Sequence, residues 1–211
     1  MKFRMTMSAL ALAALCTAAA TSFAADAKQP TKTTEAAEAA PTAEQKAMMD
    51  WMTKNQPGDG QKTLASRAGE WNLEVKSWMD PKAPPSVTKA TASAKMILDG
   101  RYLQETTVGD MGGLPFNGMG LTGYDNMTKK YKATWIDSMS TGIFTCEGTY
   151  DAATKSMTMT GETFEPMAGK VVPVKAVTRF VDDKSHVFEW WGPAPGSSEL
   201  FKSMEITYTR Q

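Results

Sequence analysis

The sequence contains few of the residues that build metal and redox sites. Its 211 residues include only 2 Cys and 1 His. One histidine argues against the usual His-rich zinc sites, and two cysteines are too few for a cysteine zinc cluster. The residue counts therefore predict no metal site. No motif along the chain identifies a cofactor or a set of catalytic residues.

An excess of charge of either sign is also missing. The 23 Lys and Arg residues are balanced by 23 Asp and Glu residues. Because a nucleic-acid binder neutralises phosphates with clustered Lys and Arg, this balance argues against such a partner. The length suits one domain with a sizeable core, together with additional residues at one end.

Long hydrophobic runs are absent except near the start of the chain. The run Met7–Ala20 follows two basic residues and is too short to span a bilayer comfortably. Ser22 and Ala24 then place small residues where a signal peptidase reads them. We interpret residues 1–24 as a signal peptide, with an uncleaved membrane anchor as the alternative. This predicts a periplasmic or secreted protein with no membrane span in its mature chain.

Residues 25–41 are rich in Ala, Lys, Thr, Glu and Pro and contain no aromatic residue. Such a composition does not offset the entropy lost on ordering, so we expect a flexible linker. Cys146 is the only thiol after residue 24, which excludes an internal disulfide. We interpret this cysteine as a packed strand residue rather than as a nucleophile.

A short amphipathic helix is predicted over residues 42–56. Thr42 and Gln45 have the spacing of a capping box, and Pro57-Gly58 ends the pattern. Met48, Trp51 and Met52 recur on one helical face. We expect this stripe to dock on the body of the protein; the alternative is a lid or a partner-binding helix.

From residue 64 onward the hydrophobic pattern has a period of two, which indicates strands. The alternating positions include Trp71, Leu73 and Val75, then Met157 and Met159, and finally Met204, Ile206 and Tyr208. Turn residues interrupt the pattern every dozen residues or so. We count about ten strands in residues 64–211. Closing the first strand onto the last would remove both exposed edges, so the fold predicted is all-β, an up-and-down antiparallel barrel.

Two hairpin turns repeat one short pattern. Tyr124-Asp125 is followed by Thr128-Lys129, and Tyr150-Asp151 is followed by Thr154-Lys155. Aspartate at the start of a tight turn accepts backbone N–H bonds, and the following threonine supports the same turn. We interpret both aspartates as turn residues, with a catalytic or metal-binding role as the alternative.

The candidate ligand-binding residues come from the aromatic residues and from polar residues expected inside the barrel. The chain has 6 Trp and 16 Met, which can either line a pocket for an apolar ligand or fill a core. The candidates are Tyr102, Tyr124, Trp135, Asp137, Arg179 and Trp190. Asp137 shares strand parity with Trp135 and so is expected to point inward. A carboxylate there needs a partner, for which Arg179 and Arg101 are the candidates.

Two further features have competing interpretations. The string Gly118–Gly123 spells a dinucleotide-binding motif, but a strand rather than a helix follows it, so we reject that function. The six glycines within Gly109–Gly123 predict a mobile loop that leads into a strand with close backbone approach. The alternative is that this loop lies at the barrel mouth and gates a cavity. His186 follows the turn Asp182-Asp183 and is interpreted as a solvated turn residue, with haem ligation as the alternative.

Several motifs together resemble a known family. Gly69-Glu70-Trp71 and the late Arg210 look like the chain-end signature of the calycin barrels, in which the Trp plugs one end and the basic side chain lies across it. The longer matches are Leu98–Leu103, Gly120–Asp125, Trp135–Ser138 and Glu205–Arg210. They resemble the DUF1579 family of bacterial proteins of undetermined function. The resemblance implies a closed barrel with Trp71 and Arg210 at the closure. Family members often carry a histidine where this chain has Gln61.

The leading hypothesis for function is a periplasmic barrel that binds a small apolar or amphiphilic molecule in its lumen. A haem-binding or other enzymatic barrel is the first alternative. The second is a non-catalytic interaction module of the cell envelope that uses the helix at residues 42–56. The sequence does not predict an oligomeric state or the identity of a ligand.

Overall fold

The structure, a computed structural model, describes residues 40–166 and 169–211. The expected signal peptide and most of the expected linker lie outside these residues. The two helices are α1 (Ala43–Lys54) and α2 (Asp59–Ala65). The strands are β1 (Gly69–Ser77), β2 (Ser86–Ile97), β3 (Tyr102–Met111), β4 (Leu114–Asp125), β5 (Lys130–Asp137), β6 (Phe144–Asp151), β7 (Ser156–Glu165), β8 (Lys170–Asp182), β9 (Ser185–Pro193) and β10 (Leu200–Arg210).

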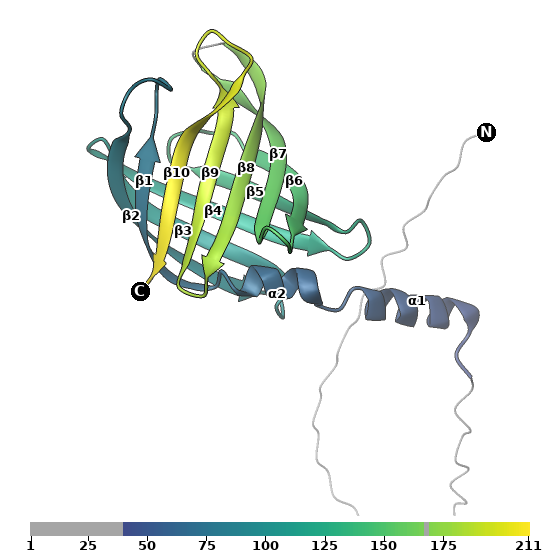
Figure 1. The fold of residues 1–211 in the computed structure, drawn as a ribbon. Coiled ribbons are helices and arrows are strands. Elements are labelled where there is room, and N and C mark those ends of the chain that lie inside the picture. The colour runs from purple at the N-terminus through teal and green to yellow at the C-terminus, as the bar shows by residue number, and fades with distance from the viewer. Residues whose placement is uncertain (1–39, 167–168) are drawn as a thin grey trace, which may run out of the picture. The chain divides into compact units, whose positions relative to one another are not determined.

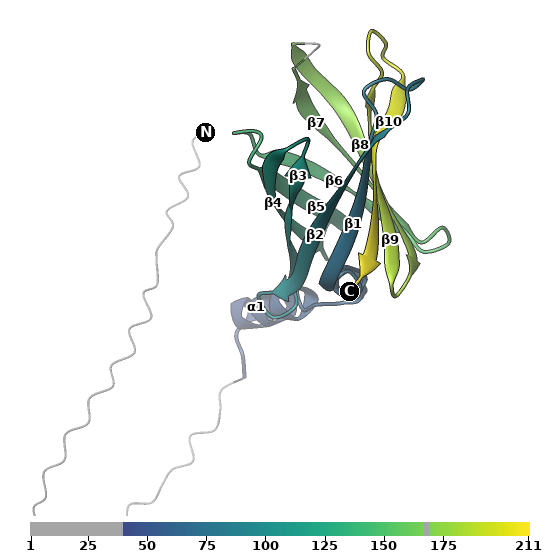
Figure 2. The same cartoon turned by 90° about the vertical axis from the view of Figure 1, so that its left-hand side faces the viewer.

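These strands form a closed antiparallel barrel, as the alternating pattern predicts. Each strand pairs with its neighbours in the sequence, and β1 pairs with β10 to close the ring. Trp71 lies opposite Arg210, and Leu73 lies opposite Tyr208. Figures 1 and 2 show β1 between β2 and β10. Closure leaves no strand with an unpaired edge, which explains why ten short strands are stable together.

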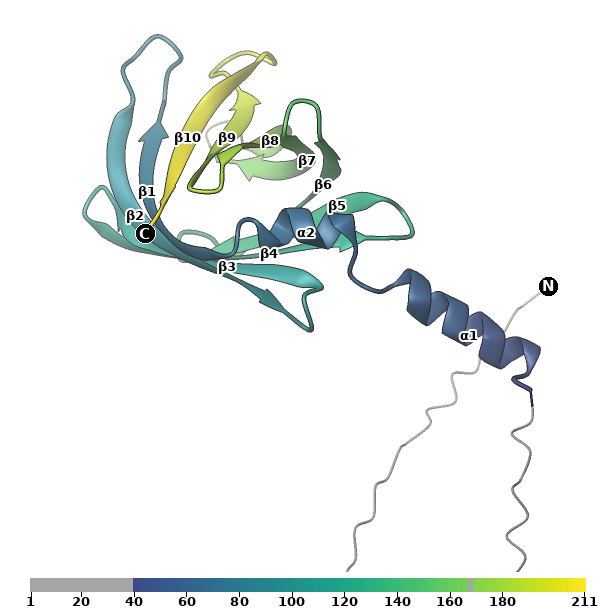
Figure 3. The ribbon, with the colours of Figure 1, turned by 60° about the horizontal axis from the view of Figure 1, so that its bottom comes forward.

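The two ends of the barrel differ. At one end, which we call the helix end, short turns join β2 to β3, β4 to β5, β6 to β7 and β8 to β9, and α2 lies near the strand ends (Figures 1 and 3). At the other, the loop end, the longer connections 78–85, 138–143 and 194–199 join consecutive strands. The helix end is therefore the more compact of the two.

The main hydrophobic core fills the helix end of the barrel. Its largest fully buried side chains are Trp71, Leu64, Leu103 and Met157. The inward positions follow the predicted alternation; for example, Met157 and Met159 are buried and Thr158 between them is exposed. Burying alternate side chains in this way gives each strand one core face and one solvent face.

Helix α1 has the predicted capping box but not the predicted docking. Thr42 Oγ1 accepts a hydrogen bond from Gln45 N, and Gln45 Oε1 accepts one from Thr42 N. The apolar stripe is exposed, with Trp51 57% accessible. The expectation that it packs on the body is wrong, because no residue of α1 is buried. Within the described residues, no helix is both long and apolar enough to cross a membrane.

Helix α2 was not predicted from the sequence. Its Leu64 side chain is fully buried in the core, and Gln61 donates from Nε2 to Tyr124 O at 2.9 Å. A Cβ at Gly60 would lie 2.2 Å from the Tyr124 ring, so only glycine allows this close approach. Gln61 therefore has a structural role at the helix end.

The repeated turns confirm the interpretation from the sequence. Asp125 accepts hydrogen bonds from Met127 N and from Thr128 Oγ1, both at 2.8 Å. Asp151 makes the equivalent bonds at 2.8 and 3.0 Å, with the amide of residue 153 and the hydroxyl of residue 154. The side-chain bond from Thr128 and the backbone bond from Met127 lower the pKa of Asp125. Both carboxylates therefore stabilise their own turns through these hydrogen bonds.

The glycine-rich stretch is a hairpin rather than a mobile loop. Gly112 and Gly113, with φ of +66° and +92°, form the whole connection between β3 and β4. The expected loop, mobile or gating, is therefore wrong, whereas the expected strand with close backbone approach is confirmed. The later glycines lie in β4, where aromatic rings pack directly on the backbone.

Candidate functional site in the barrel interior

A buried carboxylate lies inside the barrel on β3. Glu105 is only 7% exposed and alternates with Leu103 and Thr107 on the inward face of the strand. Its Oε2 accepts a hydrogen bond from Arg67 Nη2 at 2.9 Å, and its Oε1 accepts one from Tyr208 Oη at 3.0 Å. Arg67 precedes β1 and Tyr208 comes from β10, so the cluster joins three distant parts of the chain.

Among the residues that the structure describes, three buried polar side-chain atoms have no hydrogen-bond partner. They are Arg67 Nε, Thr107 Oγ1 and His186 Nε2. Thr107 is 6% exposed and is the next inward residue after Glu105 on β3. Because a buried polar group without a partner costs about 1–3 kcal/mol, unsatisfied groups of this kind call for an explanation.

His186 is a core residue, not the solvated turn residue that the sequence suggested. It is 3% exposed, and its ring stacks on Tyr208 with centroids 4.2 Å apart. Trp71 contacts the same ring edge-on at 4.6 Å. Burial, followed by the positive charges of Arg67 and Arg210, lowers the pKa of His186 to about 3. The imidazole is therefore neutral at physiological pH. The reason for the correction is strand parity: His186 pairs with Tyr208, which faces inward.

Small side chains form the inner wall of β2, β3 and β4. The inward residues there include Ala90, Ala92, Ala94, Thr107, Gly109, Gly118 and Gly120. Ala92 lies opposite Thr107, which in turn lies opposite Gly118. A wall of alanine, glycine and threonine projects little volume into the interior, so the space must be filled from the opposite side or by a ligand.

Aromatic residues occupy the interior toward the loop end. Trp135 lies on the β4 wall, since Cβ atoms at Gly118 and Gly120 would approach its ring to 2.3 and 3.1 Å. The rings of Phe144 on β6 and Trp190 on β9 meet with centroids 4.9 Å apart, although two strands separate them in the sheet. All three rings are only partly buried, unlike those of the core at the helix end.

The predicted ligand-binding residues divide between the two faces of the barrel. Tyr124, Trp135, Asp137 and Trp190 face inward; Tyr124 lies at the helix end against Tyr131, with ring centroids 4.7 Å apart. Tyr102 lies on the outer face, where its ring covers Gly123. Only Trp135, Asp137 and Trp190 belong to the part of the interior nearer the loop end.

Arg179 extends from the outer face of β8 and does not partner Asp137. The neighbouring residues Thr178 and Phe180 face the core, so Arg179 points out, with its side chain 48% exposed. Its Nη1 lies 2.8 Å from Glu189 Oε1 in an external ion pair.

Asp137 bonds within its own hairpin instead of with an arginine. Its Oδ2 accepts a hydrogen bond from Trp135 Nε1 at 2.9 Å, and its Oδ1 accepts from the amides of Met139 and Ser140. The expected ion pair with Arg179 or Arg101 is therefore wrong. Local donors satisfy this carboxylate, and they also hold the Trp135 ring in place.

One prediction concerns the fit of Trp135 on its wall. In Gly118→Ala the new Cβ would lie 2.3 Å from Trp135 Cζ2, so the indole must leave its position. We expect a loss of about 1–3 kcal/mol in the free energy of unfolding, measured by urea denaturation. Gly142→Ala is the control, because no atom lies within 4 Å of its Cβ position. Equal stability of the two variants would contradict this packing.

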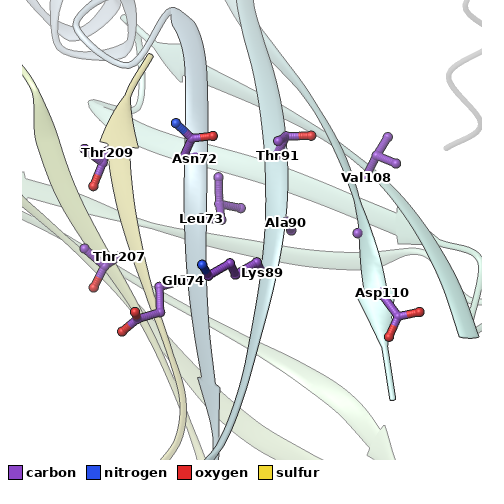
Figure 4. Close-up of a pocket in the computed structure, with 11 residues that line it drawn as sticks. Asn72, Leu73, Glu74, Lys89, Ala90, Thr91, Val108, Asp110, Thr207 and Thr209 are labelled. Carbon is purple, nitrogen blue, oxygen red and sulfur yellow. The ribbon is translucent and has the colours of Figure 1, made fainter. Parts of the chain in front are cut away.

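A separate groove of about 650 Å³ lies on the outer wall across β10, β1, β2 and β3 (Figure 4). Its side chains alternate with the core positions, as Asn72 and Glu74 do with Leu73, and most of them are exposed. None of the buried polar atoms without a partner lines this groove. Within the described ranges, no three His, Cys, Asp or Glu residues are grouped as metal ligands. The groove therefore lacks the unpartnered buried polar groups that lie inside the barrel.

The barrel closure brings together the two ends of the fold. The Arg210 guanidinium lies 4.2 Å above the Trp71 ring, and its Nη1 donates to Ala68 O at 2.8 Å. This arrangement matches the chain-end signature discussed above, and residues 56–210 match the family model described as a protein of unknown function, DUF1579. The chain belongs to the DUF1579 family. The match covers the whole barrel and α2, and the family description assigns no activity.

One solved structure similar to this DUF1579 protein supports the fold alone. Rv2717c from M. tuberculosis is 13% identical, with a TM-score of 0.52, over 74% of this chain and 99% of its own. A redesigned beta barrel, also 13% identical, has a TM-score of 0.36 over 71% of this chain and 95% of its own. No curated protein matches the sequence.

Sequence reasoning missed the buried polar cluster of this DUF1579 barrel. Glu105 and Thr107 alternate with Leu103, so the inward face of β3 was readable, but the pattern alone does not reveal a charged residue on a core face. Arg67 lies between α2 and β1, so it belongs to no periodic hydrophobic pattern. The partner of Glu105 becomes visible only in the folded chain.

Proposed function

We propose that this DUF1579 protein binds a small apolar or amphiphilic molecule inside the barrel. The observation that carries the proposal is the inner wall of alanine, glycine and threonine on β2, β3 and β4. The rings of Trp135, Phe144 and Trp190 lie inside the barrel toward its loop end. Apolar sites with few polar groups are typical of small-molecule binding, and rigid indole rings supply contact area at low entropic cost.

The polar groups needed to orient such a ligand are also inside the barrel. Thr107 and His186 each have a buried atom without a partner. An amphiphile can place its apolar part among the rings, and a shift of the neighbouring side chains would let its polar part bond to these atoms. Because hydrogen bonds made in a low-dielectric interior are stronger than in water, a few of them suffice for orientation.

A pair of adjacent substitutions tests where binding occurs. Ala90 faces the interior and Thr91 faces the outer groove, one residue apart on β2. Binding of the neutral fluorophore N-phenyl-1-naphthylamine is measured for purified residues 25–211. We expect Ala90→Leu to weaken binding about tenfold or more and Thr91→Leu to leave it unchanged, because only the first fills the interior.

The outcomes of this test are distinct. Weakening by Thr91→Leu alone would place the probe in the outer groove and contradict the proposal. Absence of binding by the unmodified protein would also contradict it. Thermal unfolding of both variants verifies that each is folded.

Export to the periplasm or beyond is the second part of the proposal. It is supported by the apolar run Met7–Ala20 and the small residues at positions 22 and 24. Mass spectrometry of the protein from a periplasmic extract of its host is expected to give a chain that begins at Ala25. A chain retaining Met1 and found only in the cytoplasmic fraction would contradict export.

A further inference from the structure

Exposed apolar side chains gather at the loop end of the barrel. Because the strands form an up-and-down ring, the connections after β1, β3, β5, β7 and β9 all lie at this end. Each of them carries or adjoins a large apolar side chain that is between 41% and 76% exposed. Single exposed hydrophobic residues are ordinary, but a set gathered at one end marks a contact surface. One residue from each connection defines what we call the loop-end rim: Met79, Leu114, Ile143, Phe164 and Leu200.

Charged residues are sparse in the same connections. The four connections that the structure describes completely contain three of them, Asp80, Lys82 and Glu199. The flanking strand ends add charges of both signs, such as Asp110 and Lys170. The turns of the helix end are shorter, yet they contain Asp99, Arg101, Lys129, Lys155, Asp183 and Lys184. The loop end therefore combines apolar tips with little charge, and it has no basic cluster that would attract an anionic surface.

Two tryptophans with lysines above their rings adjoin the rim. Trp78 directly precedes Met79, and Lys202 Nζ lies 5.5 Å from the centre of the Trp78 ring. Trp191 lies near the end of β9, and Lys175 Nζ lies 4.6 Å from the centre of that ring. Both indoles are partly buried. Indoles are enriched at the level of lipid headgroups, where lysine stems also lie along apolar surface with their charged tips in water.

The arrangement of the rim favours a lipid surface over a protein partner. Its residues come from connections distributed around a closed ring, at the end of the barrel opposite α2 (Figures 1 and 2). A stable protein interface has a continuous and closely packed apolar core. The tips of the rim are instead separated by the polar residues of the loops. A fluid lipid surface can accommodate each tip separately, and its binding strength grows with the apolar area buried.

We propose that the loop-end rim docks this protein on the surface of a neutral phospholipid bilayer. The apolar tips enter the boundary between headgroups and acyl chains, and Trp78 and Trp191 lie at headgroup depth. Because the loops carry little charge, binding depends on the apolar area removed from water and only weakly on salt. This surface goes beyond the proposed binding of a ligand in the interior and does not depend on it.

Cosedimentation with vesicles of dioleoylphosphatidylcholine tests the docking. The protein used is residues 25–211, since the apolar run Met7–Ala20 would itself bind lipid. We expect binding that changes less than about twofold between about 0.1 M and about 1 M NaCl. Absence of binding to these vesicles would overturn the proposal. Binding that appears only with added phosphatidylglycerol and is lost in high salt would overturn it as well.

Two leucines at opposite ends of the barrel provide a matched pair of substitutions. Leu114 in the rim is 60% exposed, and Leu98 in the turn after β2 is 67% exposed. Replacing either by aspartate adds the same negative charge at an exposed position. We expect Leu114→Asp to weaken vesicle binding about tenfold or more and Leu98→Asp to change it less than about twofold. Equal weakening by both would contradict docking through the loop end. Thermal unfolding verifies that each variant is folded.

A pair of tryptophans separates the rim from the exposed apolar stripe of α1. Trp51 belongs to that stripe, whereas Trp78 adjoins the rim. Vesicles of brominated phosphatidylcholine quench the fluorescence of indoles that reach the bilayer. We expect the decrease in intensity to be smaller in Trp78→Phe than in the unmodified protein and to be unchanged in Trp51→Phe. The reverse result would assign the lipid contact to α1 and overturn the proposal.

Sedimentation velocity without lipid tests the other occupant of the rim, a second copy of this chain. We expect the unmodified protein and Leu114→Asp to have the same sedimentation coefficient. A dimer that Leu114→Asp dissociates would show that the rim is an interface between copies and would overturn docking on lipid. Binding of N-phenyl-1-naphthylamine without vesicle binding removes this inference and leaves the proposed function; vesicle binding without fluorophore binding does the reverse.

Discussion

Replacing Trp71 with alanine is expected to lower the free energy of unfolding by about 3–5 kcal/mol, measured by urea denaturation followed by circular dichroism. The indole is 1% exposed, donates from Nε1 to Arg67 O at 2.9 Å, and lies under the Arg210 guanidinium. Its removal leaves a cavity at the point where β1 meets β10. Typical domains have only 5–15 kcal/mol of stability in total, so this one substitution removes a large part of it.

Trp51 is the matched control for this prediction. It is the same residue type but is exposed on α1. Trp51→Ala is expected to change the free energy of unfolding by no more than about 0.5 kcal/mol. A comparable loss in both variants would show that α1 packs on the barrel and would contradict the exposure of its apolar stripe.

Acidification is the second large effect that the structure predicts. The pKa of His186 is held near 3, against an ordinary value of 6.5, by burial and then by Arg67 and Arg210. Between these two values the unfolded chain binds a proton that the folded protein does not bind. Titration of His186 therefore leaves the free energy of unfolding unchanged above about pH 6.5. As the pH is lowered from there toward 3, it reduces the free energy of unfolding by about 1.4 kcal/mol per pH unit.

The variant His186→Phe isolates this contribution. Phenylalanine keeps a ring against Tyr208 and Trp71 but has no proton to bind. Urea unfolding at pH 6.5 and 4.5 is expected to show about 2–3 kcal/mol more loss in the unmodified protein than in the variant. The same loss in both proteins would mean that His186 titrates normally, and it would contradict the buried position of this side chain.

Much of the barrel was predictable because its signals are local. Alternation at Trp71, Leu73 and Val75 specifies the inward face of β1, whatever the rest of the chain does. The turns at Asp125 and Asp151 are likewise built from residues three apart. Such features depend only on residues that are close together in the sequence, so they can be predicted before the fold is known.

The candidate site was predicted less completely. Trp135 and Asp137 were expected to face inward together and do so, because they share the parity of Tyr131 on β5. Arg179 is expected to face inward, but its neighbours Thr178 and Phe180 belong to the inward-facing series of β8. Strand parity therefore places Arg179 on the outer face of β8, away from the inward-facing carboxylate of Asp137.

Whether the N-terminal helix α1 packs on the barrel could not be predicted from its own residues. The capping residues and the Met/Trp stripe of α1 are visible in the sequence, and the helix forms as they indicate. Whether the stripe docks depends on what surface is free. In the structure the segment after Pro57 forms α2 and buries Leu64 in the core, while the stripe of α1 stays exposed.

The sequence by itself determined the strands and the tight turns, because residue period and turn chemistry are properties of neighbouring residues. Only the tertiary structure decided that Glu105 meets Arg67 and Tyr208, and that His186 is buried between aromatic rings. These contacts join residues up to 103 positions apart. They depend on the register of non-adjacent strands and on the side chains that cross the interior, which no local pattern specifies.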